Sequence, residues 1–130
     1  MMFMTGLAFF LSASSFPGDP AVVAQAEARL VLGNQVKDRQ IVEIPTPHVY
    51  RSGETIIAWS EIVGLPTGFV EHVWFRNDKE VARHYLPVSH GRRWRTWSRH
   101  TSSAGDYRVQ VLGPDGKELA VTTFQVRKAD

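Results

Sequence analysis

Short runs of β-branched and aromatic residues, separated by clusters of Gly, Pro, Asn and Asp, fill this chain after Ala28. Such punctuation is typical of strands joined by tight turns, and no stretch there keeps the period of an amphipathic helix. The sequence predicts about seven strands, at Arg29–Val36, Thr55–Ile62, Phe69–Arg76, Glu80–Val88, Arg93–Arg99, Tyr107–Leu112 and Leu119–Val126. Short strands at this regular spacing indicate an all-β sandwich or barrel.

The chain has 130 residues, enough for one domain of ordinary size and too few for two hydrophobic cores. Hydrophobic residues make up 43% and charged residues 22%, which argues against a disordered chain. The sequence contains no cysteine, and this excludes a disulfide scaffold, a Cys-ligated zinc site, an iron–sulfur cluster and a thiol nucleophile. A sandwich built from this chain must therefore be held together by packing alone.

Two local patterns favour an immunoglobulin-like antiparallel sandwich. Trp74 lies on the third main strand and is followed by a polar turn, which is the place of the core Trp in such domains. Tyr107 follows Gly105 and precedes Val109 by two residues, which resembles a tyrosine corner. We therefore predict that Trp74, Tyr107 and Val109 lie in the core, with Ala58 and Val109 at the positions where related sandwiches carry a disulfide.

Several short motifs follow one another in a fixed order. They are Glu61-Ile-Val-Gly64-Leu65, His72-Val-Trp74, Trp94-Arg95-Thr96-Trp97-Ser98, Gly105-Asp-Tyr107-Arg-Val109 and Asp115-Gly116. Together they resemble the bacterial domain-of-unknown-function family numbered 2914, over roughly Arg29 to Val126. Asp78 stands where that family usually has Gly, and Tyr107 where it usually has Trp. The resemblance implies a small β-sandwich, often attached to an exported or membrane-anchored protein, and it implies no known activity.

Residues 2–11 (MFMTGLAFFL) are almost wholly apolar. Because about 20 apolar residues are needed to cross a bilayer, this run suits the apolar region of a secretory signal. Ala24-Gln25-Ala26 supplies a cleavage pattern before Glu27, although no Lys or Arg precedes the apolar run. We expect residues 1–26 to be a signal peptide or a trimmed membrane anchor, and residues 27–130 to be the sandwich domain. The domain would then be periplasmic or secreted, or tethered to a membrane through its N-terminal segment.

The segment from Val81 to Gly105 contains five Arg, three His and no acidic residue. Alternate residues of a strand share a face, which groups the side chains of Arg93, Arg95, Trp97 and Arg99. Guanidinium groups beside an indole can bind an anion, since Arg pairs with carboxylate or phosphate and stacks on aromatic rings. The alternative is a solvated strand face whose guanidinium groups pair with the carboxylates of Glu61, Glu71 or Glu80.

Two further polar residues have structural and functional interpretations. His72 lies two residues before Trp74 and should point into the core with it, as a hydrogen-bonded structural histidine or, alternatively, as a metal ligand or general base. The histidines show no H-x-H or H-x-x-x-H spacing, so we predict no metal site. Glu61 should form a partly buried ion pair with Arg95, a pairing that is more often structural than catalytic.

The sequence shows no paired-carboxylate motif, no nucleophile elbow and no Gly-rich phosphate loop. We therefore expect no enzyme and no cofactor. The leading hypothesis is a non-catalytic exported accessory module that binds a protein or glycan of the cell envelope. One alternative is an anion- or glycan-binding module that uses Arg93, Arg95, Trp97 and Arg99, and another is a hydrolase with an unrecognised site. The net charge of +2 is small and the domain is expected outside the cell, so we do not expect nucleic acid as a partner.

Overall fold

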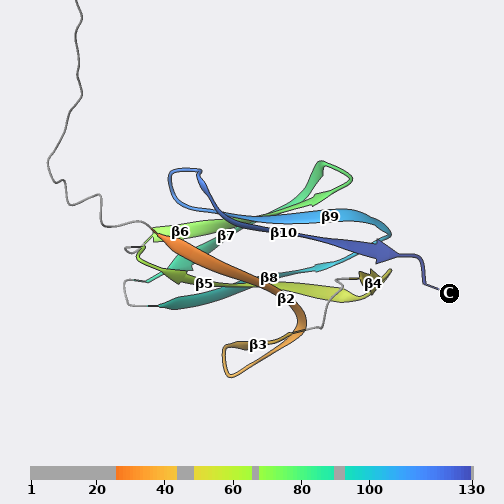
Figure 1. The fold of residues 1–130 in the computed structure, drawn as a ribbon, viewed down its shortest axis with the longest axis horizontal. Helices are drawn as coiled ribbons and strands as arrows, with labels where there is room; N and C mark the ends of the chain where they lie inside the picture. The colour runs from red at the N-terminus through yellow and green to blue at the C-terminus, as the bar shows by residue number, and fades with distance from the viewer. Residues whose placement is uncertain (1–25, 44–48, 66–67, 90–92, 130) are drawn as a thin grey trace, which may run out of the picture.

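The computed structural model describes residues 26–43, 49–65, 68–89 and 93–129, and the predicted signal or anchor segment lies outside them apart from Ala26. The strands are β2 (Glu27–Lys37), β3 (Gln40–Glu43), β4 (Val49–Arg51), β5 (Thr55–Val63), β6 (Gly68–Arg76), β7 (Lys79–Val88), β8 (Trp94–Thr101), β9 (Gly105–Leu112) and β10 (Glu118–Arg127). Figure 1 shows them stacked in two layers. The described part of the chain offers no helix of the length and apolarity that a bilayer crossing requires.

The two layers are a five-stranded sheet in the order β4-β10-β9-β6-β7 and a four-stranded sheet in the order β3-β2-β5-β8. Adjacent strands are antiparallel except at β4, which pairs in parallel with β10. The parallel pair arises because the chain leaves the four-stranded sheet after β3 and joins the edge of the other sheet alongside its last strand. The predicted immunoglobulin-like sandwich is thus confirmed, with one parallel pair at an edge.

All seven predicted strands are present, with ends that differ from the prediction by two residues or fewer. Two additional strands, β3 and β4, were not predicted, and they have four and three residues respectively. Such short runs carry little periodic signal of their own. Each depends on pairing with another part of the chain, β3 with β2 and β4 with the distant β10.

The core lies between the sheets and follows from the alternation of side chains along each strand. Its main cluster contains Leu32, Tyr50, Ile56, Ala58, Trp74, Tyr107, Val109, Phe124 and Val126. Trp74 and Val109 are 0% exposed, and the Tyr107 hydroxyl donates a hydrogen bond to the Ser103 carbonyl oxygen at 2.9 Å, as a tyrosine corner requires. Ala58 packs in the same cluster as Val109, so apolar contact occupies the place of a disulfide.

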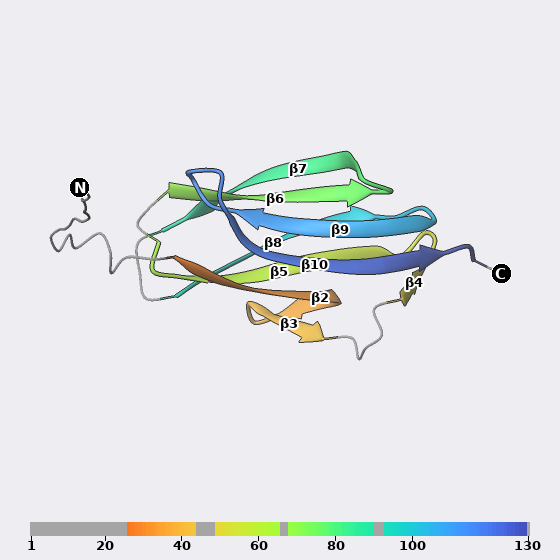
Figure 2. The ribbon, with the colours of Figure 1, turned by 45° about the horizontal axis from the view of Figure 1, so that its top comes forward.

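The outer face of the four-stranded sheet is covered at one place by the β2–β3 hairpin. Ile56 and Ala58 of β5 point into the core, so Ile57 and Trp59 point outward, yet both are buried. Figures 1 and 2 show β3 beside β2, on the side of this sheet that faces away from the other layer. Gly33 of β2 lies so close to β3 that an added Cβ would clash with the Val42 carbonyl oxygen. The hairpin therefore creates a second buried region outside the sandwich core.

Candidate functional site

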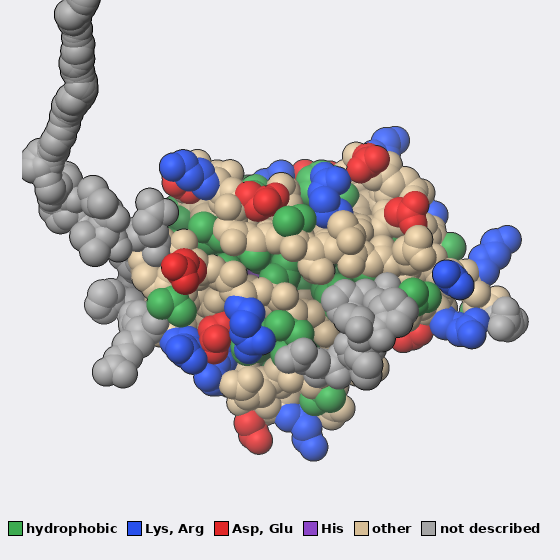
Figure 3. All heavy atoms as spheres, viewed as in Figure 1, with side chains coloured by type: hydrophobic (Ala, Val, Ile, Leu, Met, Phe, Trp, Pro, Cys, Tyr) green, Lys and Arg blue, Asp and Glu red, His purple; other side chains and the backbone are tan. Residues whose placement is uncertain are grey.

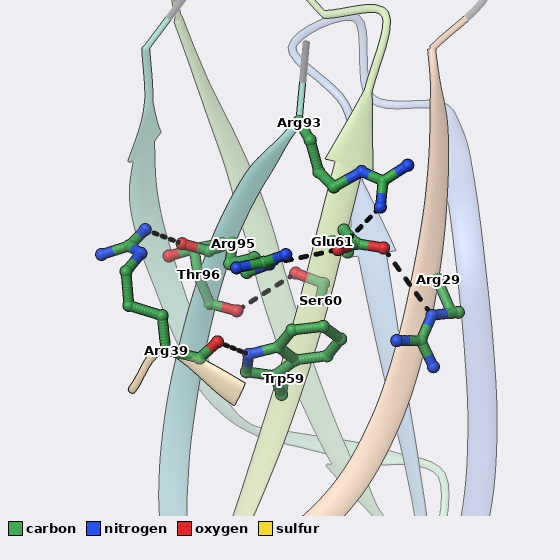
Figure 4. Close-up of polar contacts among 8 residues, drawn as sticks. All are labelled: Arg29, Arg39, Trp59, Ser60, Glu61, Arg93, Arg95 and Thr96. Carbon is green, nitrogen blue, oxygen red and sulfur yellow. Dashed lines mark hydrogen bonds and ion pairs between the residues drawn. The ribbon is translucent and has the colours of Figure 1, made fainter. Parts of the chain in front are cut away.

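Five Arg and three Trp side chains come together over the outer face of the four-stranded sheet and the free edge of β8. This arginine–tryptophan face consists of Arg29, Arg39, Arg93, Arg95, Arg99, Trp59, Trp94 and Trp97. Figure 4 shows its centre, and in Figure 3 Lys and Arg side chains gather at the lower left, where Figure 1 places the ends of β5 and β8. The four residues predicted to bind a ligand belong to it.

Glu61 of β5 lies at the centre of the basic groups. Its carboxylate is 3.2 Å from Arg95 Nε, 3.7 Å from Arg93 Nη1 and 3.8 Å from Arg29 Nε. This arrangement follows from sheet register, because Glu61 pairs with Arg29 of β2 on one side and with Arg95 of β8 on the other. Three guanidinium groups thus share one carboxylate whose side chain is only 11% exposed.

The other carboxylates considered as partners for the Arg run lie elsewhere. Glu71 and Glu80 both pair with Arg83 on the five-stranded sheet, at 2.7 and 2.8 Å. Within the arginine–tryptophan face, Arg93 keeps 57% of its side chain exposed and Arg95 keeps 31%. The Arg run is therefore divided between the two sheets, and Arg93 and Arg95 share their carboxylate partner.

Arg39 was not among the predicted site residues, yet it contacts several members of the arginine–tryptophan face. It lies in the β2–β3 turn with φ 63°, beside Asp38 with φ 50°, the left-handed pair that a two-residue hairpin turn needs. Its carbonyl oxygen accepts a hydrogen bond from Trp59 Nε1 at 2.9 Å, and its Nη2 donates to the Arg95 carbonyl oxygen at 2.8 Å. Its guanidinium carbon is 5.3 Å from the ring centre of Trp94 and 5.7 Å from that of Trp97, which are cation–π distances.

Two surface hollows flank Arg39. One, of about 330 Å³, is lined by Arg39, Arg93, Trp94 and Arg95. The other, of about 430 Å³, is lined by Asn34, Gln35, Val36, Asp38, Arg39, Ile57, Trp97 and Arg99. The structure therefore brings the four predicted binding residues to one face but divides them between two hollows that have Arg39 in common.

A larger hollow, of about 730 Å³, lies on the five-stranded sheet and is lined in part by Phe75, Asp78, Asp106 and Arg108. Arg108 pairs there with Asp78 at 3.2 Å, and its guanidinium carbon is 4.2 Å from the Phe75 ring centre. With two carboxylates and one guanidinium in its lining, this hollow does not offer the charge that an anion needs.

His72 lies in the core, where it joins the two sheets through hydrogen bonds. Its Nδ1 is 2.8 Å from Ser98 Oγ and its Nε2 is 2.8 Å from Ser60 Oγ. Trp74 Nε1 donates to Ser98 Oγ at 3.0 Å, which leaves the Ser98 hydroxyl proton for His72 Nδ1. The network thereby assigns the His72 proton to Nε2, from which it is donated to Ser60 Oγ. With a neutral His72, every donor in this hydrogen-bond network has an acceptor. A charged His72 would carry protons on both ring nitrogens and would leave the Ser98 hydroxyl proton without an acceptor.

The pKa of His72 is lowered to about 3, chiefly by burial and to a lesser extent by the nearby His84. The pKa of His100 is also lowered, first by burial and then by His84. Among the residues that the structure describes, no group of three or more His, Cys, Asp or Glu is placed to hold a metal ion. His72 therefore acts in this structure as a neutral cross-link between the sheets.

Residues 69–126 match a family model described as a protein of unknown function, DUF2914. The resemblance to family 2914 is confirmed. The match is narrower than the expected range from Arg29, and the motif at Glu61–Leu65 lies outside it. The DUF2914 match includes Arg93, Arg95, Trp97 and Arg99, while Arg39 and Trp59 precede it.

No curated protein matches the chain. Among solved structures, the CARDB domain of a Pyrococcus furiosus protein is 9% identical, with a TM-score of 0.48 over 81% of this chain and 94% of that one. A β-glucosidase from Listeria innocua is 13% identical, with a TM-score of 0.49 over 78% of this chain and 16% of that one. These similarities concern the fold of the chain alone.

Proposed function

We propose that this domain is a non-catalytic, exported module that binds an anionic ligand of the cell envelope on its arginine–tryptophan face. The observation that carries the proposal is that the guanidinium groups of Arg93 and Arg95 share the single carboxylate of Glu61. An anion placed among these groups would relieve their mutual repulsion and gain charge-assisted hydrogen bonds.

The fixed position of the Arg39 guanidinium is a second observation that favours a ligand-binding face over a merely solvated one. Arg39 is fixed by its turn, by its hydrogen bond to Arg95 and by two indole rings, so its guanidinium loses little further freedom when a ligand binds. Arginine has five N–H donors, and one Arg39 donor atom is used in the bond to Arg95. The remaining donors can serve a ligand in a position that is already set.

Retention on a polyanion column tests this function. The full chain should bind heparin–agarose at low salt and elute as the ionic strength rises, because salt screens exposed charges. Changing Arg93 and Arg99 together to Gln should abolish retention at moderate salt. The same change should leave the free energy of unfolding within about 1 kcal/mol, since it affects exposed side chains.

The matched control changes Lys117 and Lys128 to Gln, which removes the same charge from exposed positions outside this face. Its retention should stay close to that of the wild type. Failure of the wild-type chain to bind even at low salt would refute the proposed function, and so would an equal loss of retention in the control.

A second candidate function, binding of a protein partner, has one observation in its favour. Phe69 and Tyr85 are 44% and 62% exposed on the five-stranded sheet, with their ring centres 5.6 Å apart. Exposed aromatic pairs are enriched where proteins meet. Binding that is insensitive to salt and is lost in Tyr85→Ser would favour this candidate.

A further inference from the structure

We infer that the arginine–tryptophan face holds two anion subsites, one on each side of Arg39, and that its ligand is a linear acidic glycan long enough to occupy both. This inference rests on the proposed function and specifies the ligand of the same face. It starts from the two hollows that share Arg39.

The first subsite is the hollow lined by Arg39, Arg93, Trp94 and Arg95, where the Arg39 guanidinium lies over the Trp94 ring. The Glu61 carboxylate offsets part of this charge through its contacts with Arg93 and Arg95. Such a cluster suits a single carboxylate or sulfate group, which can accept hydrogen bonds from more than one guanidinium.

The second subsite has a different composition. Arg39 and Arg99 supply the positive charge, Asn34 and Gln35 supply amide groups, and Asp38 supplies a carboxylate. Amides and a carboxylate can bind hydroxyl groups, since between them they both donate and accept hydrogen bonds. A ligand that carries hydroxyls together with well-separated anionic groups matches this lining, and an acidic glycan has that chemistry.

The distance between the subsites requires an extended ligand. Arg93 and Arg99 are six residues apart along an extended segment. At about 3.4 Å per residue, their backbones lie roughly 20 Å apart. A small anion can occupy either hollow but cannot contact both Arg93 and Arg99, whereas a polymer that follows β8 can.

The groups that cover the tryptophan rings favour a glycan over a single-stranded nucleic acid as the ligand. Bases bind such proteins by stacking on open aromatic faces. Here Arg39 lies over the rings of Trp94 and Trp97, and Trp59 is fully buried beneath the hairpin. The ring faces that bases would need are thus taken by a guanidinium group.

The test measures how affinity depends on ligand length, by titration calorimetry of the full chain with heparin-derived oligosaccharides of two, four and eight sugar units. Affinity should rise by about tenfold or more at the length that reaches the second subsite, because the second contact becomes intramolecular. Arg93→Gln and Arg99→Gln should each reduce the affinity for the octasaccharide to near that for the disaccharide. Only one of these two substitutions should also weaken binding of the disaccharide, because so short a ligand occupies a single subsite. The melting temperature of each variant checks that it is folded, and Lys117→Gln is the charge-matched control.

The outcomes separate the two proposals. Equal affinity for short and long oligosaccharides would overturn the two-subsite inference and leave the proposed function standing. Tighter binding of oligodeoxythymidylate than of the octasaccharide would overturn the assignment to glycans. Absence of binding to every probe at low salt would overturn the proposed function and this inference with it.

Discussion

Trp74 and Trp97 lie in different environments although both are large indoles within strands. Trp74 is 0% exposed and packs in the main core cluster, while Trp97 is partly exposed on the outer face beneath Arg39. Truncation of a buried aromatic side chain removes its transfer free energy and leaves a cavity. The two residues should therefore respond differently to the same substitution.

We predict that Trp74→Ala lowers the free energy of unfolding by about 3–5 kcal/mol. Trp97→Ala should cost much less, because part of its ring is already in contact with water. Urea denaturation of both variants and of the wild type provides the measurement. Equal losses at the two positions would show that the inward and outward assignment of these strands is wrong.

His72 makes the stability of the domain depend on pH. Its pKa is about 3 when folded, below the ordinary value of about 6.5 that it takes in the unfolded chain. The unfolded state therefore binds more protons below pH 6.5, and the contribution of neutral His72 to stability is full above that pH and is lost as the pH falls toward the folded pKa. The free energy of unfolding should therefore decrease in mild acid.

We predict that the free energy of unfolding falls by about 1 kcal/mol per pH unit between about pH 6.5 and about pH 5, where carboxylates are still largely ionised. Urea denaturation across that range measures the slope. His72→Gln keeps a polar side chain without the titrating ring and should reduce the slope, leaving the contribution of His100, whose pKa is also lowered. His84→Gln removes the neighbouring imidazole and serves as the comparison, with a smaller effect expected. An unchanged slope in His72→Gln would contradict the assignment.

The β2–β3 hairpin is the element on which the candidate site depends. It places Arg39 across β5 and β8, and it buries Trp59. The close approach of β2 and β3 is possible because residue 33 is Gly, where an added Cβ would also lie 2.8 Å from the Ile41 side chain. Movement of the hairpin should therefore change both stability and ligand binding.

Gly33→Ala tests this element. We predict a loss of about 1–3 kcal/mol in the free energy of unfolding, because the backbone must shift to admit the methyl group. Heparin retention should weaken in the folded variant, since Arg39 moves with the hairpin. Asn34→Ala, at the adjacent exposed position, should keep the wild-type stability. Unchanged stability and retention in Gly33→Ala would show that the hairpin does not position the site.

For the whole molecule, period-two patterns made the long strands predictable. In β6 and β9 the buried and exposed positions alternate closely enough to identify Trp74, Tyr107 and Val109 as inward-facing. In β5 the residues from Ile56 to Ser60 are all buried, because the hairpin covers the outward ones. No local sequence pattern in β5 predicts that the β2–β3 hairpin covers its outward-facing residues.

The candidate site was predictable in part for the same reason. Alternation along one strand grouped Arg93, Arg95, Trp97 and Arg99 on one face. Arg39 meets Arg95 across 56 residues of sequence, and that contact depends on the path of the hairpin over the sheet. The Asp38-Arg39 turn contains no Gly, so the usual signal of a two-residue hairpin is missing.

The N-terminal segment yields a prediction about the molecule as a whole. A chain that begins at Glu27 should unfold cooperatively within a few degrees of the melting temperature of the full chain, because β2 begins at that residue and the sandwich core is built from later ones. Differential scanning calorimetry of the two chains gives the comparison. A large loss of stability in the shorter chain would show that residues 1–26 are part of the fold.

The bond from Arg39 to the Arg95 carbonyl oxygen has a consequence for self-association. β8 is the last strand of its sheet, and an unpaired strand edge is a template on which another chain can add. Arg39 occupies an acceptor on that edge and lays a charged group across it. Release of the hairpin would expose the indoles of Trp59 and Trp97 together with an open strand edge, the combination that leads to aggregation. The residue proposed to bridge the two anion subsites thus also covers part of the strand edge on which a neighbouring copy could add.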